Sequence, residues 1–250
     1  MKPSFLTYTK PILTTMIQTR EPKNGYETMK RAIKEGTEAF GFQACRLKPE
    51  FRTQEIFRRF TENAEGRPVY ATNYRYGYNE GLSDDELAEG ILQLADAGVT
   101  LCDVMGDMFC KDPDELTMDE VAVKKQMELV RQLHEKGTEV LMSSHTYAFR
   151  SAERVLEIAL EQQKRGADIV KIVTGADNME QQLENLRITR MLKQELKVPF
   201  LFLSVGECGL HRRIGPMLGS CMWLCVQEYD ELSTPAQPLL RNIKAIRENF

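Results

Sequence analysis

Short apolar, β-branched runs alternate with segments of helical periodicity along the chain, and this alternation constrains the fold more than any other feature. Eight such runs recur at mostly about 30-residue spacing and are typical of strands. The runs are 11–17, 39–47, 68–73, 100–105, 139–144, 168–173, 199–205 and 221–226. Segments of helical periodicity follow these runs at 26–35, 53–63, 120–136, 151–165, 178–196, 212–218 and 238–249. One more helix begins at a capping box at Ser83, after the third run. This order predicts an α/β fold, a closed (β/α)8 TIM barrel that forms one domain over residues 1–250.

The alternative architecture is an open, doubly wound parallel sheet. Its first strand usually runs into a Gly-rich loop that binds phosphate. Here the chain continues from Pro11 to Arg20 without a glycine. The sequence therefore favours the barrel.

Composition excludes several functional classes. A chain of 250 residues is long enough to bury a core that needs neither a metal nor a disulfide, and its 42% of hydrophobic residues is close to the average for a soluble protein. The net charge of −4 argues against a nucleic-acid or membrane-surface binder. The sequence has no apolar run of membrane-spanning length and no N-terminal signal-peptide pattern, and its six cysteines form no C-x-x-C pair. We expect a cytoplasmic protein with reduced thiols, and no membrane partner.

Polar residues that interrupt the strands or follow their ends are the candidates for a site, because the active sites of such barrels lie at the carboxyl ends of the strands. In chain order these residues are Arg46, Thr72 to Arg75, Asp103, Ser143 to His145, Lys171, Ser204, Arg212 and Arg213, and 233–237.

Lys171 is the most informative of them, because it lies in the otherwise apolar run Ile169-Val170-Lys171-Ile172-Val173. Strand alternation puts Val170 and Ile172 on one face and Lys171 on the other. If the valine and isoleucine pack on helices, the lysine points into the barrel. Burial there favours the neutral amine, the form that condenses with a ketone to a Schiff base. The alternatives are a lysine that points outward and a structural ion pair with Asp103.

His145 is the candidate proton carrier. Imidazole titrates near neutrality and works as both an acid and a base. His145 ends a strand next to that of Lys171, whereas His134 lies on a charged helix and His211 lies beside two arginines in a loop. The alternative is a purely structural histidine.

Four arginines meet at one rim if the barrel is correct, namely Arg46, Arg75, Arg212 and Arg213. Together they would bind an anion, such as a carboxylate, and would lower the pKa of a nearby lysine. The alternative is a set of exposed surface pairs. The acidic run 112–120 is interpreted as a solvated loop and helix start rather than a metal site.

These segments resemble the type I 3-dehydroquinate dehydratase family, the Schiff-base enzymes of the shikimate pathway. Ser143-Ser144-His145-Thr146-Tyr147 is similar to the family's S-x-H-[DN]-F motif, and Ala167-Asp168-Ile169-Val170-Lys171-Ile172 to A-D-I-[VP]-K-[IL]. Arg212-Arg213-Ile214 with Leu218-Gly219-Ser220 resembles S-R-[ILV]…[FL]-G-S, and Ser233-Thr234-Pro235-Ala236-Gln237 resembles S-A-P-G-Q. Cys45-Arg46-Leu47 and Thr72-Asn73-Tyr74-Arg75 resemble the W-R-[VI] and T-[FW]-R strand ends.

The resemblance implies a hydro-lyase without metal or cofactor. Lys171 would form the imine and His145 would move the protons. Ser233, Gln237 and one of Arg212 and Arg213 would hold a substrate carboxylate. Arg46 and Arg75 would also bind substrate, and Asp103 and Glu80 would support the site from behind. We also expect a homodimer.

The chain departs from the family on the side that would meet the substrate's ring hydroxyls. Ala44 and Lys48 stand where the family has acidic residues, and Met105 ends what is a D-x-E pattern in the family. We therefore expect weak activity on 3-dehydroquinate and better turnover of a related carboxylated hydroxyketone. Two other hypotheses are a lyase or aldolase-like Schiff-base enzyme with a different substrate, and a non-catalytic barrel that binds a carboxylate.

Overall fold

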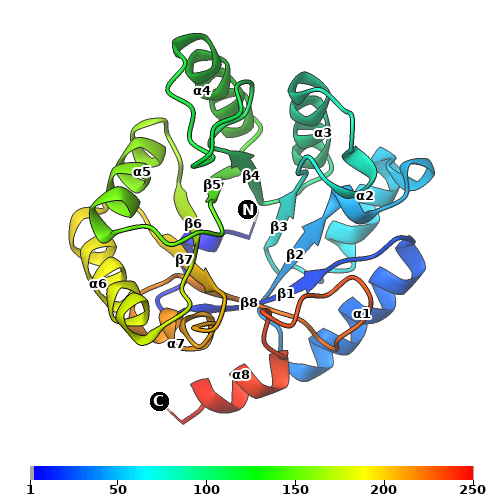
Figure 1. The fold of residues 1–250 in the computed structure, drawn as a ribbon. Helices are drawn as coiled ribbons and strands as arrows, with labels where there is room; N and C mark the ends of the chain where they lie inside the picture. The colour runs from blue at the N-terminus through cyan, green and yellow to red at the C-terminus, as the bar shows by residue number, and fades with distance from the viewer. Residues whose placement is uncertain (1–2, 250) are drawn as a thin grey trace.

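The structure is a computed structural model that describes residues 3–249, and it has the expected architecture: parallel strands form a central barrel, and the helices surround it (Figure 1). The strands are β1 (Ile12–Ile17), β2 (Ala39–Gln43), β3 (Val69–Thr72), β4 (Leu101–Met105), β5 (Glu139–His145), β6 (Ile169–Gly175), β7 (Phe200–Val205) and β8 (Met222–Cys225). The helices are α1 (Pro22–Glu35), α2 (Gln54–Glu62), α3 (Asp84–Asp96), α4 (Glu120–Glu135), α5 (Ala152–Lys164), α6 (Met179–Glu195), α7 (His211–Leu218) and α8 (Leu240–Arg247). Within the described residues, no helix is long and apolar enough to cross a membrane.

The sheet order is β7-β6-β5-β4-β3-β2-β1-β8, with every neighbouring pair parallel. The remaining seam, between β7 and β8, is bridged by a backbone hydrogen bond of 2.8 Å from Cys221 N–H to the carbonyl of Phe200. The barrel is thus nearly closed, and the carboxyl ends of all its strands meet at one mouth.

Strand alternation separates two apolar layers. Val170 and Ile172 face outward and join a core with residues of α5 such as Val155 and Ile158. Ile169 and Val173 face inward with the barrel's own core. Lys171 shares the inward face, as expected from its position in the strand.

The inside of the barrel changes from apolar to polar along its axis. Phe5 joins the apolar inner cluster, and its backbone N–H donates to Glu139 at the start of β5. Nearer the mouth, Asp103, Ser143 and Lys171 follow Leu101, Leu141 and Ile169 on the same faces of β4, β5 and β6. The polar layer is therefore set by strand register.

Two expectations need correction. The second strand ends at Gln43, and residues Ala44–Arg46 form a 3₁₀ turn closed by the backbone N–H of Leu47 on the carbonyl of Ala44. The guanidinium of Arg52 binds the carbonyls of Cys45 and Leu47. His211 is the first residue of α7 and is fully buried, rather than lying in a loop.

Candidate active site

A cavity of about 510 Å³ opens at the mouth of the barrel, and Lys171 and His145 both line it. Four tyrosines contribute to its wall, as do three of the four arginines expected there. Those residues are Tyr70, Tyr74, Tyr76, Tyr147, Arg46, Arg75 and Arg212. A neighbouring cavity of about 550 Å³, between the β1–α1 and β8–α8 loops, shares Met16, Gln18 and Leu232 with it.

Lys171 is buried, and each polar partner of its ammonium is an acceptor. Nζ lies 2.6 Å from the hydroxyl of Tyr74, 3.0 Å from that of Tyr70 and 3.2 Å from Oδ2 of Asp103. Burial lowers the pKa of Lys171, and the charge of Asp103 opposes that shift. Both features considered from the sequence are thus present: the lysine points inward, and it is paired with Asp103.

Asp103 is the centre of this polar cluster. Both phenols donate to its Oδ2, and Ser143 Oγ donates to its Oδ1 at 2.5 Å. Burial and the charge of Asp103 raise the pKa of Tyr70 and Tyr74 well above the usual value, so both phenols keep their protons. The cluster therefore holds one ammonium and one carboxylate, with its hydrogen-bond directions set by these groups.

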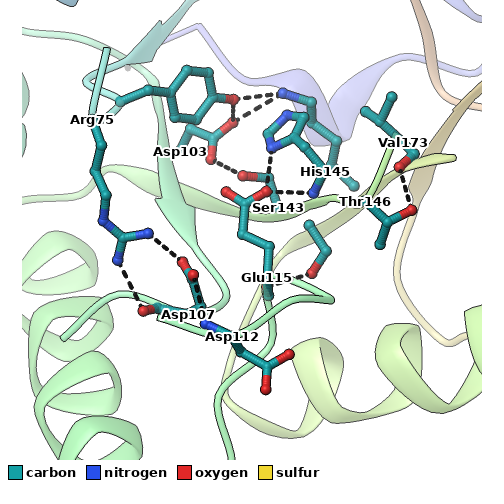
Figure 2. Close-up of polar contacts among 12 residues, drawn as sticks. Arg75, Asp103, Asp107, Asp112, Glu115, Ser143, His145, Thr146 and Val173 are labelled. Carbon is teal, nitrogen blue, oxygen red and sulfur yellow. Dashed lines mark hydrogen bonds and ion pairs between the residues drawn. The ribbon is translucent and has the colours of Figure 1, made fainter. Parts of the chain in front are cut away.

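His145 is held by a residue that the sequence analysis did not identify, Glu115 in the β4–α4 connection. Glu115 Oε2 lies 2.8 Å from Nδ1 of His145, and the backbone N–H of His145 donates to the same oxygen. Figure 2 shows the Glu115 side chain pointing toward His145, with Asp103 beyond Ser143. The imidazole also packs edge-on against Tyr74, with 5.1 Å between ring centroids. His145 therefore contacts the ring of Tyr74, whose hydroxyl accepts a hydrogen bond from Lys171.

The loop that carries Glu115 is anchored at several points. Glu115 has a left-handed backbone (φ 50°), which costs a non-glycine residue on the order of 1 kcal/mol. Its carbonyl accepts a hydrogen bond of 2.8 Å from Ser144. A Cβ on Gly106 would lie 2.6 Å from that carbonyl, so only glycine fits there without a shift. Buried Arg165 binds the carbonyls of Gly106 at 3.1 Å and Thr117 at 2.6 Å. The strained residue is thus fixed in place.

Two of the arginines that line the cavity form no ion pair within residues 3–249. Arg46 lies over the ring of Tyr76, 4.8 Å from its centroid, and its buried Nε has no hydrogen-bond partner in the described chain. Arg212 donates from Nε to the carbonyl of Ser204 at 3.0 Å, and burial lowers its pKa to about 10. Both remain available to an anionic ligand.

Arg75 and Arg213 are placed differently. Arg75 forms ion pairs with Asp84 at 2.8 Å and Asp107 at 2.7 Å, and it points away from His145 in Figure 2. Arg213 is not among the residues that line the cavity, and its guanidinium donates to the carbonyl of Gly209. The structure thus assigns the cavity-facing position to Arg212.

Of the two residues expected at the site from the loop after β8, one lines the cavity and the other does not. Gln237 lines the cavity, is 4% exposed, and its Oε1 has no partner within the described residues. Ser233 lines the neighbouring cavity instead, because its hydroxyl closes a turn with the backbone of Asp230. Glu80 is exposed after a 3₁₀ turn and lies outside both cavities.

Two contributing residues, Tyr70 and Glu115, were missed from the sequence, and Tyr74 was a candidate only as part of the segment Thr72 to Arg75. Tyr70 lies two residues before Thr72 in β3 and therefore points to the same face, so the period of the strand could have placed it inside the barrel. Tyr74 lies within a quoted motif, beside its arginine. Glu115 lies in the acidic run 112–120, which we interpreted as solvated; that interpretation is wrong for Glu115, because the path of the loop brings it to His145.

The fold and the cavity define a (β/α)8-barrel protein with a lysine–histidine site at its mouth. The chain belongs to the type I 3-dehydroquinase family, whose model matches residues 78–249. It is 29% identical over 140 residues to a 3-dehydroquinate dehydratase of Alkaliphilus oremlandii, a match covering 54% of each chain. It is 30% identical over 120 residues to that of Geobacillus thermodenitrificans, covering 47% of this chain and 46% of the relative. The chain thus spans about half the length of the curated relatives it matches.

Solved structures of similar shape extend the likeness to the whole barrel. The type I 3-dehydroquinate dehydratase from Clostridium difficile, solved with covalently modified comenic acid, has a TM-score of 0.81 at 17% identity. The 3-dehydroquinate dehydratase from Geobacillus kaustophilus gives the same two values. Each match covers 98% of this chain and 94% of the other. At 17% identity, the likeness to these structures establishes the fold of this chain and no more.

Proposed function

We propose that this protein is a Schiff-base hydro-lyase that removes water from a carboxylated cyclic β-hydroxyketone, with 3-dehydroquinate and its product 3-dehydroshikimate as the reference reaction. The observation that carries the proposal is the shared cavity of Lys171 and His145, in a chain of the type I 3-dehydroquinase family. The buried amine is suited to attack a ketone, and the imidazole beside it is suited to move protons.

The proposed sequence of steps begins at Lys171. Its amine attacks the ketone and forms an iminium with loss of water. The iminium makes the adjacent C–H acidic, so that His145 removes that proton and leaves an enamine. His145 then protonates the β-hydroxyl, which departs as a second water. Hydrolysis of the conjugated imine frees the product and returns Lys171 as the amine.

Arg212 and Gln237 support the proposal that the substrate carries an anionic group. Arg212 is a desolvated cation with no carboxylate partner in the described chain, and buried Gln237 has an unpartnered Oε1. A guanidinium in such surroundings binds a carboxylate with charge-assisted hydrogen bonds. Arg46 adds a second unpaired cation to the wall of the cavity.

The second candidate is the same chemistry on a ketone with fewer or altered hydroxyls. Glu115 is the only acidic residue lining the cavity within residues 3–249, and its Oε2 binds His145. The amides of Gln18 and Gln43 lie 3.1 Å apart on the wall, so the polar contacts available to ring hydroxyls there come from neutral groups. A site without the matching acceptors gains little from a hydroxyl.

The test is kcat/KM for 3-dehydroquinate beside a panel of carboxylated cyclic ketones with fewer hydroxyls. A value of about 10⁵ M⁻¹s⁻¹ or more for 3-dehydroquinate supports the reference reaction. A lower value, together with faster turnover of a panel member, supports the second candidate. No dehydration of any of these ketones would contradict the proposed function.

The cytoplasmic location and the homodimer belong to the proposal as well. Both stay predictions. Fractionation of the source cells tests the first, and light scattering of the purified protein tests the second.

A further inference from the structure

The hydroxyl of Tyr74 lies between the two charged groups of the lysine cluster. It accepts a hydrogen bond of 2.6 Å from Nζ of Lys171 and donates to Oδ2 of Asp103. Tyr70 and Tyr74 both line the cavity, but Tyr74 is 8% exposed and Tyr70 is fully buried. Nζ also contacts Oδ2 of Asp103 directly at 3.2 Å, yet Asp103 does not line the cavity, so Tyr74 is the more exposed link between that carboxylate and a ligand.

Imine formation requires a path for protons between Nζ and the ligand. An ammonium with three protons and a ketone become an iminium with one N–H proton and one molecule of water. Two protons thus leave nitrogen, and two arrive on the former carbonyl oxygen. As the C–N bond forms, the carbonyl π electrons move to oxygen, and the C–O bond then breaks to release water. No external proton is consumed.

His145 is poorly suited to this transfer, because none of the polar contacts of Nζ is with the imidazole. The contacts of Nζ are with Tyr70, Tyr74 and Asp103. The imidazole touches the ring of Tyr74, and Glu115 holds its Nδ1. The site therefore contains two separate acid–base pairs, Tyr74 with Asp103 and His145 with Glu115.

We propose that Tyr74 and Asp103 carry the two protons from Nζ to the departing oxygen, while His145 and Glu115 serve the proton transfers at carbon. This division of labour rests on the proposed function.

In the first transfer, Tyr74 passes its phenolic proton to Asp103 as it takes one from Nζ. Asp103 then gives that proton back through Tyr74 to the oxygen, and the second proton follows the same path. The resulting iminium keeps Asp103 as its counter-ion, so the charge of the cluster is unchanged. Tyr70 holds Asp103 in position from the buried side.

A mild variant is available for the test. Tyr74→Phe removes one oxygen atom and keeps the ring that packs against Tyr76 and His145. Tyr74→Trp is the second variant if the first unfolds. Tyr26→Phe is the matched control, because it removes a phenol on α1 that does not line the cavity.

The experiment isolates imine formation in the His145→Ala background, where loss of the later proton transfers should let the imine accumulate. Protein is mixed with 3-dehydroquinate, quenched with borohydride at successive times, and the reduced adduct is measured by intact mass. We expect His145→Ala/Tyr74→Phe to form the adduct roughly 10²-fold more slowly than His145→Ala. The Tyr26→Phe double variant should match His145→Ala.

The outcomes separate the two proposals. An unchanged rate of adduct formation in the folded Tyr74 variant overturns the role of Tyr74 and leaves the proposed function intact. Absence of any adduct in both His145→Ala and the wild type, with 3-dehydroquinate or the ketone panel, overturns the proposed function and the proton path together.

Discussion

Glu115 Oε2 lies 2.8 Å from Nδ1 of His145 and also accepts the backbone N–H of that residue. This double contact orients the imidazole ring, because a carboxylate on Nδ1 leaves Nε2 as the nitrogen that meets a substrate. The carboxylate comes from a loop fixed by Ser144 and Arg165, and not from Glu80, which we expected to support the site.

Glu115→Gln should therefore lower kcat by roughly 10- to 10²-fold with a smaller effect on KM, because the amide keeps the shape but loses the charge that holds and supports His145. Borohydride trapping of the imine should be preserved. Steady-state kinetics and intact mass check both parts, with exposed Glu120→Gln as the control. A wild-type kcat in Glu115→Gln would show that the contact does not serve His145.

Arg212 and Arg213, in the first turn of α7, should differ in their effect on activity. Arg212→Gln removes the desolvated cation that lines the cavity, and kcat/KM should fall by roughly 10- to 10²-fold, mainly through KM, the range for a charged hydrogen bond. Arg213→Gln should stay near the wild-type value, because its guanidinium donates to Gly209. Equal losses in the two variants would contradict this assignment.

His211 should make stability depend on pH. Its ring is fully buried, with the amide of Gln182 on Nδ1 and Thr189 on Nε2, and burial lowers its pKa to about 4. In the unfolded chain a histidine has a pKa near 6.5. Above pH 6.5 the ring is neutral in both states and the stability is fully present. As the pH falls from 6.5 towards 4, the unfolded chain binds a proton that the folded protein does not bind.

The free energy of unfolding should therefore fall by on the order of 3 kcal/mol over that interval through this residue. Urea denaturation at pH 7 and pH 5 samples most of that interval and should show a fall of about 2 kcal/mol through His211. His211→Gln should reduce the loss between the two values, whereas His134→Gln, which changes an exposed ring, serves as the control. An identical loss in wild type and His211→Gln would exclude His211 as the cause.

The barrel and the positions of Lys171 and His145 could be predicted because both depend on local rules. Strand period and strand ends determine which residues point inward and which reach the mouth. The expectation that Lys171 points into the barrel is confirmed, with Val170 and Ile172 packed outward on α5 and α6.

The remaining parts of the site depend on geometry that strand and helix periodicity does not encode. Glu115 reaches His145 through the path of the loop that Gly106, Ser144 and Arg165 define. Ser233 has a motif match, yet its hydroxyl is used within a turn. The choice between Arg212 and Arg213 follows from where α7 begins.

The proposed mechanism requires that Lys171 form the covalent bond to the substrate. Wild-type protein can be incubated with 3-dehydroquinate and borohydride, then digested and mapped by mass spectrometry. We expect one reduced adduct, carried by the peptide that contains Lys171 and absent from Lys171→Ala. An adduct on another lysine that persists in Lys171→Ala would exclude Lys171 as the covalent residue.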